Sequence, residues 1–392
     1  MTPRRLIVAF VAGLIGAPAV AHSQTPPPWP TRGWEQASPA ALGFDAEALD
    51  RLDQEFAAGK HGYVDSMLIV RHGRVALERS YRHDYDRLFV GKGAPGIYNY
   101  FDPAWHPYYK RSTLHTMQSV SKSVTSALVG IAIARGEIPS VDVPVMPYFA
   151  AFKAKPDPRR DRMRLRDVLT MTTGIRWDES STTYTNATNN CAEMEATDDW
   201  VQYVLDQPMA TDPGATFVYN SGATEMLSYI LQKTTGKPAD DYAREHLFEP
   251  LGIRSFWKRT PKGLADTEGG LYLEPRDLAK FGYLYLHDGM WDGKRILPAG
   301  WTKESTRWIV DVGKTGRGYG YKWWVLSRAG AGSYDAYAAL GYGGQRLIVV
   351  PALDLIAVFT GWNIYDKPEL NPKLALDRVV AAVKRVQSEV RW

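Results

Sequence analysis

The feature that most limits the possible folds is the position of the strand-like segments, which lie toward the two ends of the chain. Residues 64–81 contain two β-rich runs on either side of His72-Gly73, a turn pair, and this pattern predicts a β-hairpin. Four more strand-like runs, separated by Gly and Pro, come near the C-terminus, at residues 321–326, 336–340, 345–350 and 355–360. We therefore expect one sheet that both ends of the chain build together.

The middle of the chain has helical patterns instead. Residues 119–134 read as a buried helix that Gly136 can end. Further helical patterns lie at residues 165–172, 198–205, 224–235 and 239–248, and one more follows Pro372. The sequence thus predicts an α+β fold with a helical insertion between two halves of a sheet. We expect the first part of the α/β domain in residues 22–110, the helical region in 111–255 and the second part in 256–392.

The N-terminal segment has the parts of a secretory signal peptide. Arg4 and Arg5 precede an apolar stretch at residues 6–16, which is short for a membrane span, and residues 19–21 form a small-x-small cleavage site. We therefore expect residues 1–21 to be removed, and the mature protein to be secreted or periplasmic without membrane contact.

Composition narrows the classes of partner. The formal net charge is +4, and no segment has the dense run of Lys and Arg that nucleic-acid binding requires, so we expect no nucleic-acid partner. Cys191 is the single cysteine, so no internal disulfide can form. The eight histidines include no spacing typical of metal ligands, and we expect neither a metal nor a cofactor. The oligomeric state stays open.

A serine and a lysine at the start of the first long helix pattern carry the candidate chemistry. A serine hydroxyl needs an adjacent base, and a lysine can serve if its pKa is lowered. Ser119 and Lys122 are three positions apart, on one helix face, where the positive end of the helix dipole disfavours an ammonium. We therefore expect a neutral Lys122 that acts as the base for Ser119. A second Ser-x-x-Lys, Ser255 to Lys258, lies in a loop or strand context, and we interpret it as chance.

Two further motifs could complete such a site. Tyr219 stands before Asn220-Ser221, and a tyrosine beside a Ser/Lys pair can carry a proton to the leaving group, although a packing tyrosine would give the same tripeptide. Tyr342 and Gly344 lie in a glycine-rich run ahead of a strand. A strand edge beside the nucleophile can donate an N–H to an oxyanion, and a simple strand bend is the alternative. The expected oxyanion or substrate contacts are Tyr342, Ser221 and Gly344.

The order of these motifs resembles the serine β-lactamase and penicillin-binding family. The closer likeness is to class C enzymes, their esterase relatives and the aminohexanoate-oligomer hydrolases. It extends from about residue 40 to the end and includes the phrases at residues 169–174, with Trp177, and at 248–252 and 269–271.

The resemblance implies a role for each candidate residue. Ser119 would be the acylated nucleophile, Lys122 the base and Tyr219 the proton shuttle. The oxyanion hole would consist of the Ser119 N–H and a strand N–H near Tyr342. The resemblance also implies an antiparallel sheet flanked by helices, with a helical domain packed on it and the site between the two.

Three positions depart from the family pattern. The third position of the family's Tyr-x-Asn motif is Ser221 here, and Asn220 comes one place early. The strand has Tyr342 where the lactamases carry a cation. The literal Lys314-Thr315-Gly316 precedes the strand at residues 321–326, whereas the family's strand comes later and leads into the turn at Pro351, so we interpret this tripeptide as a coincidence.

We therefore expect a serine hydrolase that acts through an acyl-enzyme on a small ester or amide. Tyr342 can offer only a neutral hydrogen bond in place of a cation that helps hold a carboxylate, which predicts weak or absent β-lactamase activity, although an arginine of the helical region could replace that cation. Trp177 and Tyr184, expected to border the site, favour apolar acyl groups. The alternatives are a β-lactamase or D-Ala-D-Ala peptidase, and a catalytically silent binding protein of the same fold.

Overall fold

The structure is a computed structural model that describes residues 29–92, 113–328, 334–365 and 369–384. The expected signal peptide lies outside these residues. Within them, the main sheet has nine strands in the order β1-β3-β2-β14-β13-β12-β11-β10-β9. In chain order these are β1 Glu35–Gln36, β2 Val64–Arg71, β3 Arg74–Ser80, β9 Val310–Asp311, β10 Gly318–Tyr319, β11 Trp324–Ser327, β12 Ala336–Gly341, β13 Gln345–Val350 and β14 Leu355–Gly361.

The main sheet joins the two ends of the chain, as the sequence predicts. The hairpin of β2 and β3 turns at His72-Gly73, and β14 pairs antiparallel with β2, placing Ala357 opposite Ile69. Every pairing in this sheet is antiparallel except that of β1 with β3, within the described residues. The expected α+β class with an antiparallel sheet is therefore confirmed.

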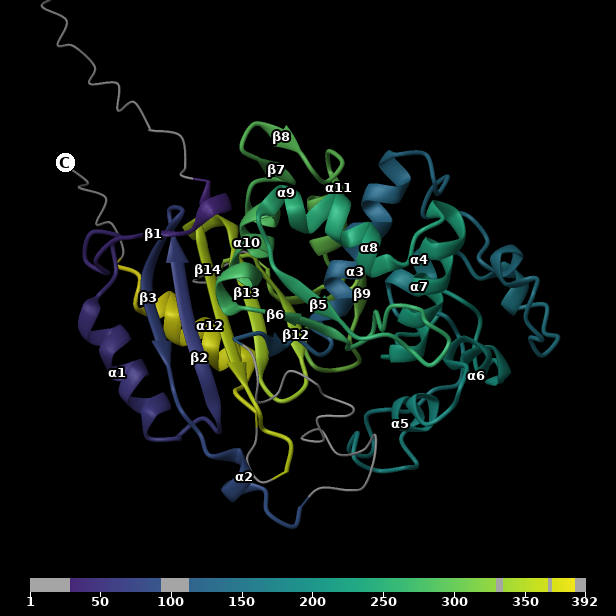
Figure 1. Ribbon diagram of the computed structural model, residues 1–392, viewed down its shortest axis with the longest axis horizontal. Helices are drawn as coiled ribbons and strands as arrows, with labels where there is room; N and C mark the ends of the chain where they lie inside the picture. Colours follow the sequence, from purple (N-terminus) through teal and green to yellow (C-terminus); the bar gives the residue numbers. More distant parts are fainter. Residues whose placement is uncertain (1–28, 93–112, 329–333, 366–368, 385–392) are drawn as a thin grey trace, which may run out of the picture.

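Helices cover both faces of the main sheet (Figure 1). One face carries Met67, Ile69 and Phe359, which pack with the apolar sides of α1 and α12. The opposite face carries Leu68 and Val70, which belong to the larger core that includes α3 and α10. Since neighbouring residues of β2 are buried on opposite faces, its central run at residues 67–70 is apolar and does not alternate with polar residues. The helices are α1 Ala46–Ala57, α2 Tyr85–Leu88, α3 Val120–Ala134, α4 Leu165–Leu169, α5 Asn190–Glu195, α6 Trp200–Asp206, α7 Ser221–Thr235, α8 Ala239–Ala243, α9 Glu249–Leu251, α10 Pro275–Leu286, α11 Trp301–Thr306 and α12 Pro372–Ala381.

The helical region lies beside the main sheet and its covering helices, and α3 stands between the sheet and the helical region (Figure 1). Helices α4 to α7 contribute to the same core as α3, so the insertion does not fold around a separate centre. Two small sheets accompany it, one of β4 His115–Thr116, β6 Leu271–Leu273 and β5 Ser255–Trp257, and one of β7 Met290–Trp291 and β8 Lys294–Arg295. No helix within the described ranges combines the length and apolar character needed to cross a membrane.

Several element boundaries differ from the sequence prediction for local reasons. Helix α4 ends at Leu169 because Met171 has a left-handed backbone, with φ of 60°. Strand β11 begins at Trp324 and not at Tyr321, because Lys322 is also left-handed, with φ of 63°, and turns the chain. Helix α7 begins earlier than expected, since the Asn220 side chain caps it by accepting a hydrogen bond from the backbone of Ala223 at 2.8 Å.

Candidate active site

The nucleophile candidate stands at a fixed point where α3 begins. Ser119 is the N-cap residue of α3, and the preceding Gln118 has φ of 48°, a left-handed conformation that costs a non-glycine residue about 1–3 kcal/mol. Met117 donates its N–H to the Leu271 carbonyl at 2.8 Å, which anchors this turn to β6. On the other side, a Cβ added to Gly341 would lie 2.3 Å from the Met117 carbonyl oxygen, so β12 ends directly against the turn.

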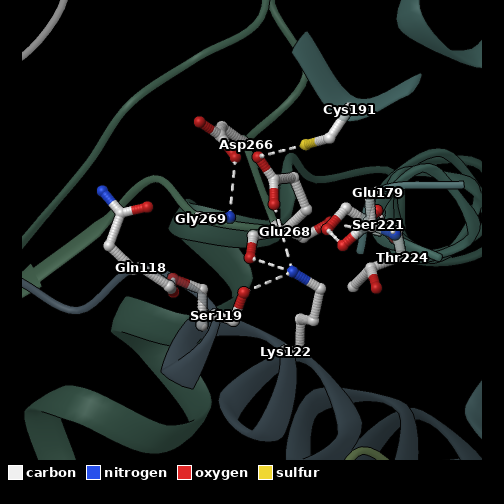
Figure 2. Close-up of polar contacts among 12 residues, drawn as sticks. Gln118, Ser119, Lys122, Glu179, Cys191, Ser221, Thr224, Asp266, Glu268 and Gly269 are labelled. Carbon is white, nitrogen blue, oxygen red and sulfur yellow. Dashed lines mark hydrogen bonds and ion pairs between the residues drawn. The ribbon is translucent and has the colours of Figure 1, made fainter. Parts of the chain in front are cut away.

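Lys122 lies one turn into α3 with its amine beside the serine hydroxyl. Its Nζ is 2.8 Å from Ser119 Oγ, 2.7 Å from the Glu268 carbonyl oxygen and 3.1 Å from Glu268 Oε2. Figure 2 shows all three contacts converging on the amine. The Lys122 side chain is 1% exposed. An ammonium has three protons to donate, and these three acceptors use all of them.

The charge of Lys122 differs from the expectation drawn from its position. Burial opposes the ammonium, but interactions with the Tyr219 hydroxyl and with the carboxyl groups of Glu268 and Glu179 outweigh it and raise the Lys122 pKa. The expectation of a neutral Lys122 in the resting protein is therefore wrong. That expectation took account only of burial and the helix dipole. It omitted the carboxylate of Glu268, which comes from the distant segment between β5 and β6 and pairs with the Lys122 amine.

Glu268 belongs to a group of neighbouring acidic side chains, most of which are neutral. Burial favours its neutral form, but Lys122 and a hydrogen bond from Glu195 lower the Glu268 pKa, so it carries the charge. Burial and the charge of Glu268 raise the pKa of Glu195 well above its ordinary value. Burial also raises the pKa of Glu225, which accepts the Glu268 N–H at 2.9 Å. The arrangement is thus one carboxylate beside Lys122, supported by neutral carboxylic acids.

Three of these groups could in principle hold a metal ion. The ligand atoms of Cys191, Glu195 and Glu268 lie within 4.8 Å of one another. However, Glu268 already pairs with the ammonium of Lys122, and burial holds the thiol of Cys191 in its neutral form by raising its pKa. Because a metal prefers a thiolate and an unshared carboxylate, we assign no metal here.

Tyr219 stands at the other side of the serine. Its hydroxyl interacts with the Ser119 side chain, and Lys122 Nζ is 5.3 Å from the centre of its ring. Burial raises the Tyr219 pKa, although the charge of Lys122 opposes this, so the residue is a neutral phenol. The ring stacks on Trp324 with centroids 5.6 Å apart, which fixes its position. The three residues predicted as catalytic are therefore together.

Ser221 and Asn220 do not contact the cavity as the family motif would suggest. Asn220 is fully buried as the cap of α7. Ser221 is also fully buried, and both its N–H and its hydroxyl donate to Glu179, at 2.7 and 2.8 Å. Glu179 accepts two further bonds, from Trp177 at 2.6 Å and from Tyr184 at 2.9 Å. Ser221 thus holds Glu179 in place, which differs from the predicted contact with substrate.

Ser119 and Tyr219 line a cavity of about 630 Å³, a volume typical of small-molecule sites. Tyr342 lines it, with its ring 4.9 Å from that of Tyr184 and its hydroxyl donating to Ile364. Gly344 does not line it and packs against Asn363 in the turn after β12, so it does not make the expected substrate contact. Other lining residues are Ser119, Glu179, Ser180, Thr182, Thr183, Tyr219, Arg317, Trp324, Leu340, Gly341, Arg346, Glu369, Leu370, Asn371 and Pro372.

Neither of the two sequence matches set aside as coincidences contributes a residue to the wall of this cavity. Ser255 begins strand β5, and Lys258 pairs with the buried Asp266 at 3.2 Å. Lys314-Thr315-Gly316 forms the exposed turn between β9 and β10. Neither has the helix that aligns Ser119 with its lysine.

Sequence reasoning missed four charged residues around the site. Glu268 directly precedes a recognised glycine pair, Glu179 follows Trp177 by two positions, Lys322 interrupts an aromatic run, and Arg317 lies next to the tripeptide that was set aside. The available signal was a charge inside an apolar or aromatic segment, which marks a buried group that needs a partner.

Comparison with known proteins agrees with this geometry. A family model described as Beta-lactamase matches residues 49–362. The chain is 23% identical over 229 residues to a Salmonella typhi protein provisionally named D-alanyl-D-alanine carboxypeptidase, and the match covers 56% of this chain and 49% of that protein. The chain therefore spans about half the length of the curated relatives it matches.

Solved structures with the same fold include two hydrolases. A protein from Bacillus anthracis, provisionally named a 6-aminohexanoate-dimer hydrolase, superposes with a TM-score of 0.66 at 19% identity, covering 89% of this chain and 86% of that one. A D-stereospecific amidohydrolase from Streptomyces superposes with a TM-score of 0.60 at 15% identity, covering 86% of this chain and 98% of that one. At these identities the likeness concerns the fold.

Proposed function

Because the chain belongs to the Beta-lactamase family, we propose that it is a serine hydrolase that acts through an acyl-enzyme on a small ester or amide. The observation that carries the proposal is the 2.8 Å contact between Lys122 Nζ and Ser119 Oγ at the wall of a cavity large enough for a small substrate. Nucleophilic catalysis by a serine requires a base within hydrogen-bond reach, and Lys122 is such a neighbour.

The proton path follows from the charge of Lys122. As an ammonium it cannot accept a proton, so it first gives one to the Glu268 carboxylate, 3.1 Å away. The resulting amine then takes the proton of Ser119 while Oγ forms a bond to the carbonyl carbon. A buried ion pair has a high desolvation cost, and moving the proton from Lys122 to Glu268 makes both groups neutral and removes that cost. Glu268 thereby makes Lys122 a base.

Tyr219 and the backbone complete the reaction. As a neutral phenol in contact with Ser119, Tyr219 can pass a proton to the leaving group as its bond to the acyl carbon breaks. Within the described residues, no acceptor pairs with the Ser119 N–H, which leaves it available to an oxyanion. We assign the second donor to a backbone N–H near Tyr342 at the end of β12. Water then releases the acyl group by the reverse path.

The alternative enzymes would use the same nucleophile, whereas a silent protein would use none. The family and the named relatives are compatible with a β-lactamase or a D-Ala-D-Ala peptidase, and a silent binding protein would share the fold. The contacts among Ser119, Lys122 and Tyr219 favour an active enzyme over a silent one. The N-terminal pattern supports a secreted or periplasmic location, which we propose with the activity.

The test is covalent labelling with a fluorophosphonate combined with turnover. Ser119→Ala should abolish both, while Ser255→Ala, the matched control, should keep both. On the same preparation, kcat/KM for p-nitrophenyl butyrate should exceed that for a chromogenic cephalosporin. Labelling that survives in Ser119→Ala would refute the nucleophile, and a clear preference for the cephalosporin would favour the lactamase.

A further inference from the structure

Of the residues that the structure describes, four charged side chains line the cavity beside Ser119, and three of them are already neutralised or fully bonded. Glu179 accepts four hydrogen bonds from neighbouring side chains and backbone. Arg346 pairs with Glu369, and its other donors reach the Gly341 and Gln345 carbonyls at 2.7 and 2.8 Å. Glu369 also accepts the Gly343 N–H at 2.7 Å. These three residues therefore have little capacity left for a ligand.

Arg317 is the fourth charge, and it differs from the other three. Its backbone is fixed between β9 and β10, where its carbonyl accepts the Val312 N–H at 3.0 Å. Its side chain is partly buried in the cavity wall, and among the described residues no carboxylate lies within ion-pair distance of it. Burial and the nearby Arg346 lower its pKa, but a guanidinium does not lose its proton in proteins. Within the part of the chain that the structure describes, the cavity wall thus contains one cation whose charge is not balanced.

We propose that Arg317 forms a subsite that binds a carboxylate of the substrate. The inference rests on the proposed function, since it places the carboxylate on the ester or amide that Ser119 attacks. A guanidinium can bind a carboxylate through two parallel hydrogen bonds, so the geometry of this anion matches that of the side chain. The cation of this subsite comes from the β9–β10 hairpin. Its source therefore differs from the two positions considered in the sequence, which are the strand position now occupied by Tyr342 and the helical region.

The wall next to Arg317 indicates what joins the carboxylate to the scissile bond. Trp324 lines the same cavity and stacks on Tyr219, the residue beside Ser119. An aromatic surface of this kind favours an apolar or aryl spacer. We therefore expect a substrate whose reactive carbonyl lies at Ser119 and whose carboxylate is separated from it by such a spacer.

The experiment measures binding without turnover, in the Ser119→Ala protein. Monophenyl glutarate, which has a carboxylate, is compared with phenyl butyrate, its neutral match, by calorimetry. Adding Arg317→Gln should weaken binding of monophenyl glutarate by about tenfold, the difference between a charged and a neutral hydrogen bond. Arg317→Lys should retain part of the preference. Lys314→Gln, an exposed cation of the same hairpin, should leave it intact.

A parallel arm uses the protein with Ser119 and compares turnover of 4-carboxyphenyl butyrate with that of phenyl butyrate. A carboxylate preference that depends on Arg317 in either arm supports the subsite and assigns the anion to the acyl or the leaving part. Equal weakening of charged and neutral ligands by Arg317→Gln, or no effect in both arms, would overturn it. If binding depends on Arg317 while no ester is hydrolysed, the proposed function fails and the subsite stands.

Discussion

Two buried lysines of this protein have pKa values shifted in opposite directions because their neighbours differ. Lys122 has the carboxylate of Glu268 within 3.1 Å, and its pKa is raised. Lys322 is equally buried, but its Nζ contacts the Met171 sulfur at 3.2 Å. Burial and the charge of Lys122 hold the pKa of Lys322 well below its ordinary value, which favours the neutral amine. Burial alone therefore does not decide which lysine can act as a base.

The role of Glu268 can be tested by removing its charge while keeping its shape. In the native protein, Glu268 is ionised down to pH values below its ordinary pKa of 4.5, so activity should fall only in that acidic range. Glu268→Gln should lower kcat/KM by about 10²- to 10⁴-fold. Without the carboxylate, burial dominates at Lys122 and lowers its pKa, so the acid limb should then report Lys122 and move to higher pH.

The matched control is Glu225→Gln in the same group of acids. Glu225 is already neutral, since burial raises its pKa, and a glutamine oxygen can accept the same bonds from Thr267 and the Glu268 N–H. Its pH profile should match the native one. A Glu268→Gln protein that is slower at every pH, with the acid limb unmoved, would reduce Glu268 to a packing role.

Helix α3 and strand β12 meet at a contact that leaves no room for a side chain. Gly341 ends β12 against the Met117 carbonyl, two residues before the nucleophile. The position of the strand edge relative to Ser119 therefore depends on the absence of a Cβ at one residue. Geometry of this kind matters because a displacement of about 1 Å can cost roughly 10²-fold in rate.

Gly341→Ala should consequently impair catalysis more than folding. A Cβ there would lie 2.3 Å from backbone, so β12 must move away from the Ser119 turn. We expect kcat/KM to fall by about 10²-fold and the unfolding free energy by about 1–3 kcal/mol. Gly282→Ala is the control, because its Cβ would meet the Leu347 side chain at 2.7 Å, away from Ser119.

Comparing the two glycine variants distinguishes the effect of moving the β12 edge relative to Ser119 from the effect of a packing clash elsewhere. Gly282→Ala should lose stability but keep its turnover per folded molecule, measured by steady-state kinetics on protein quantified by active-site labelling. Native kcat/KM in Gly341→Ala would mean that the strand edge does not position the reaction.

At the scale of the whole molecule, the segment before β11 contacts two helices of the helical region. Lys322 lies there, with its N–H bonded to the Leu169 carbonyl of α4 at 3.0 Å and its carbonyl accepting the Ser123 hydroxyl of α3 at 2.6 Å. These backbone contacts stabilise that arrangement, whereas the buried amine destabilises it. The unfolded chain protonates this amine at pH values where the folded protein keeps it neutral, so folding must release a proton.

The sign of this linkage gives a prediction for stability. A lysine whose folded pKa is lowered makes stability rise with pH, and its penalty disappears only as pH approaches the unfolded value of 10.5. Lys322→Met should therefore be at least as stable as the native protein at about pH 7, and the difference between the two should shrink toward about pH 9.5. Urea unfolding across that range measures both.

Lys258→Met provides the contrasting control. Lys258 is a half-buried lysine whose ammonium pairs with the buried Asp266 at 3.2 Å, so its removal leaves a buried carboxylate without a cation. We expect a loss of about 3–5 kcal/mol, as for other broken buried pairs. If Lys322→Met is destabilised to the same extent at neutral pH, the native Lys322 is charged and paired.

Short-range sequence patterns were enough to predict several secondary-structure elements of this protein and the contact between Ser119 and Lys122. The hairpin around His72-Gly73 and the helix that begins after Ser119 follow from apolar periodicity and turn residues, which act over a few positions. The spacing of Ser119 and Lys122 likewise fixed their contact, because three positions on a helix bring two side chains to one face. Tyr219 was found through the order of motifs.

Only the tertiary structure decided the charges. Glu268 lies 146 positions from Lys122, and no local pattern links an acid before β6 to a lysine on α3. Ser221 turned from the cavity to Glu179, and Arg317 entered the cavity wall through a hairpin that looked irrelevant in the sequence. Electrostatic energies depend on distance and burial, and both are set by packing between segments far apart in the chain.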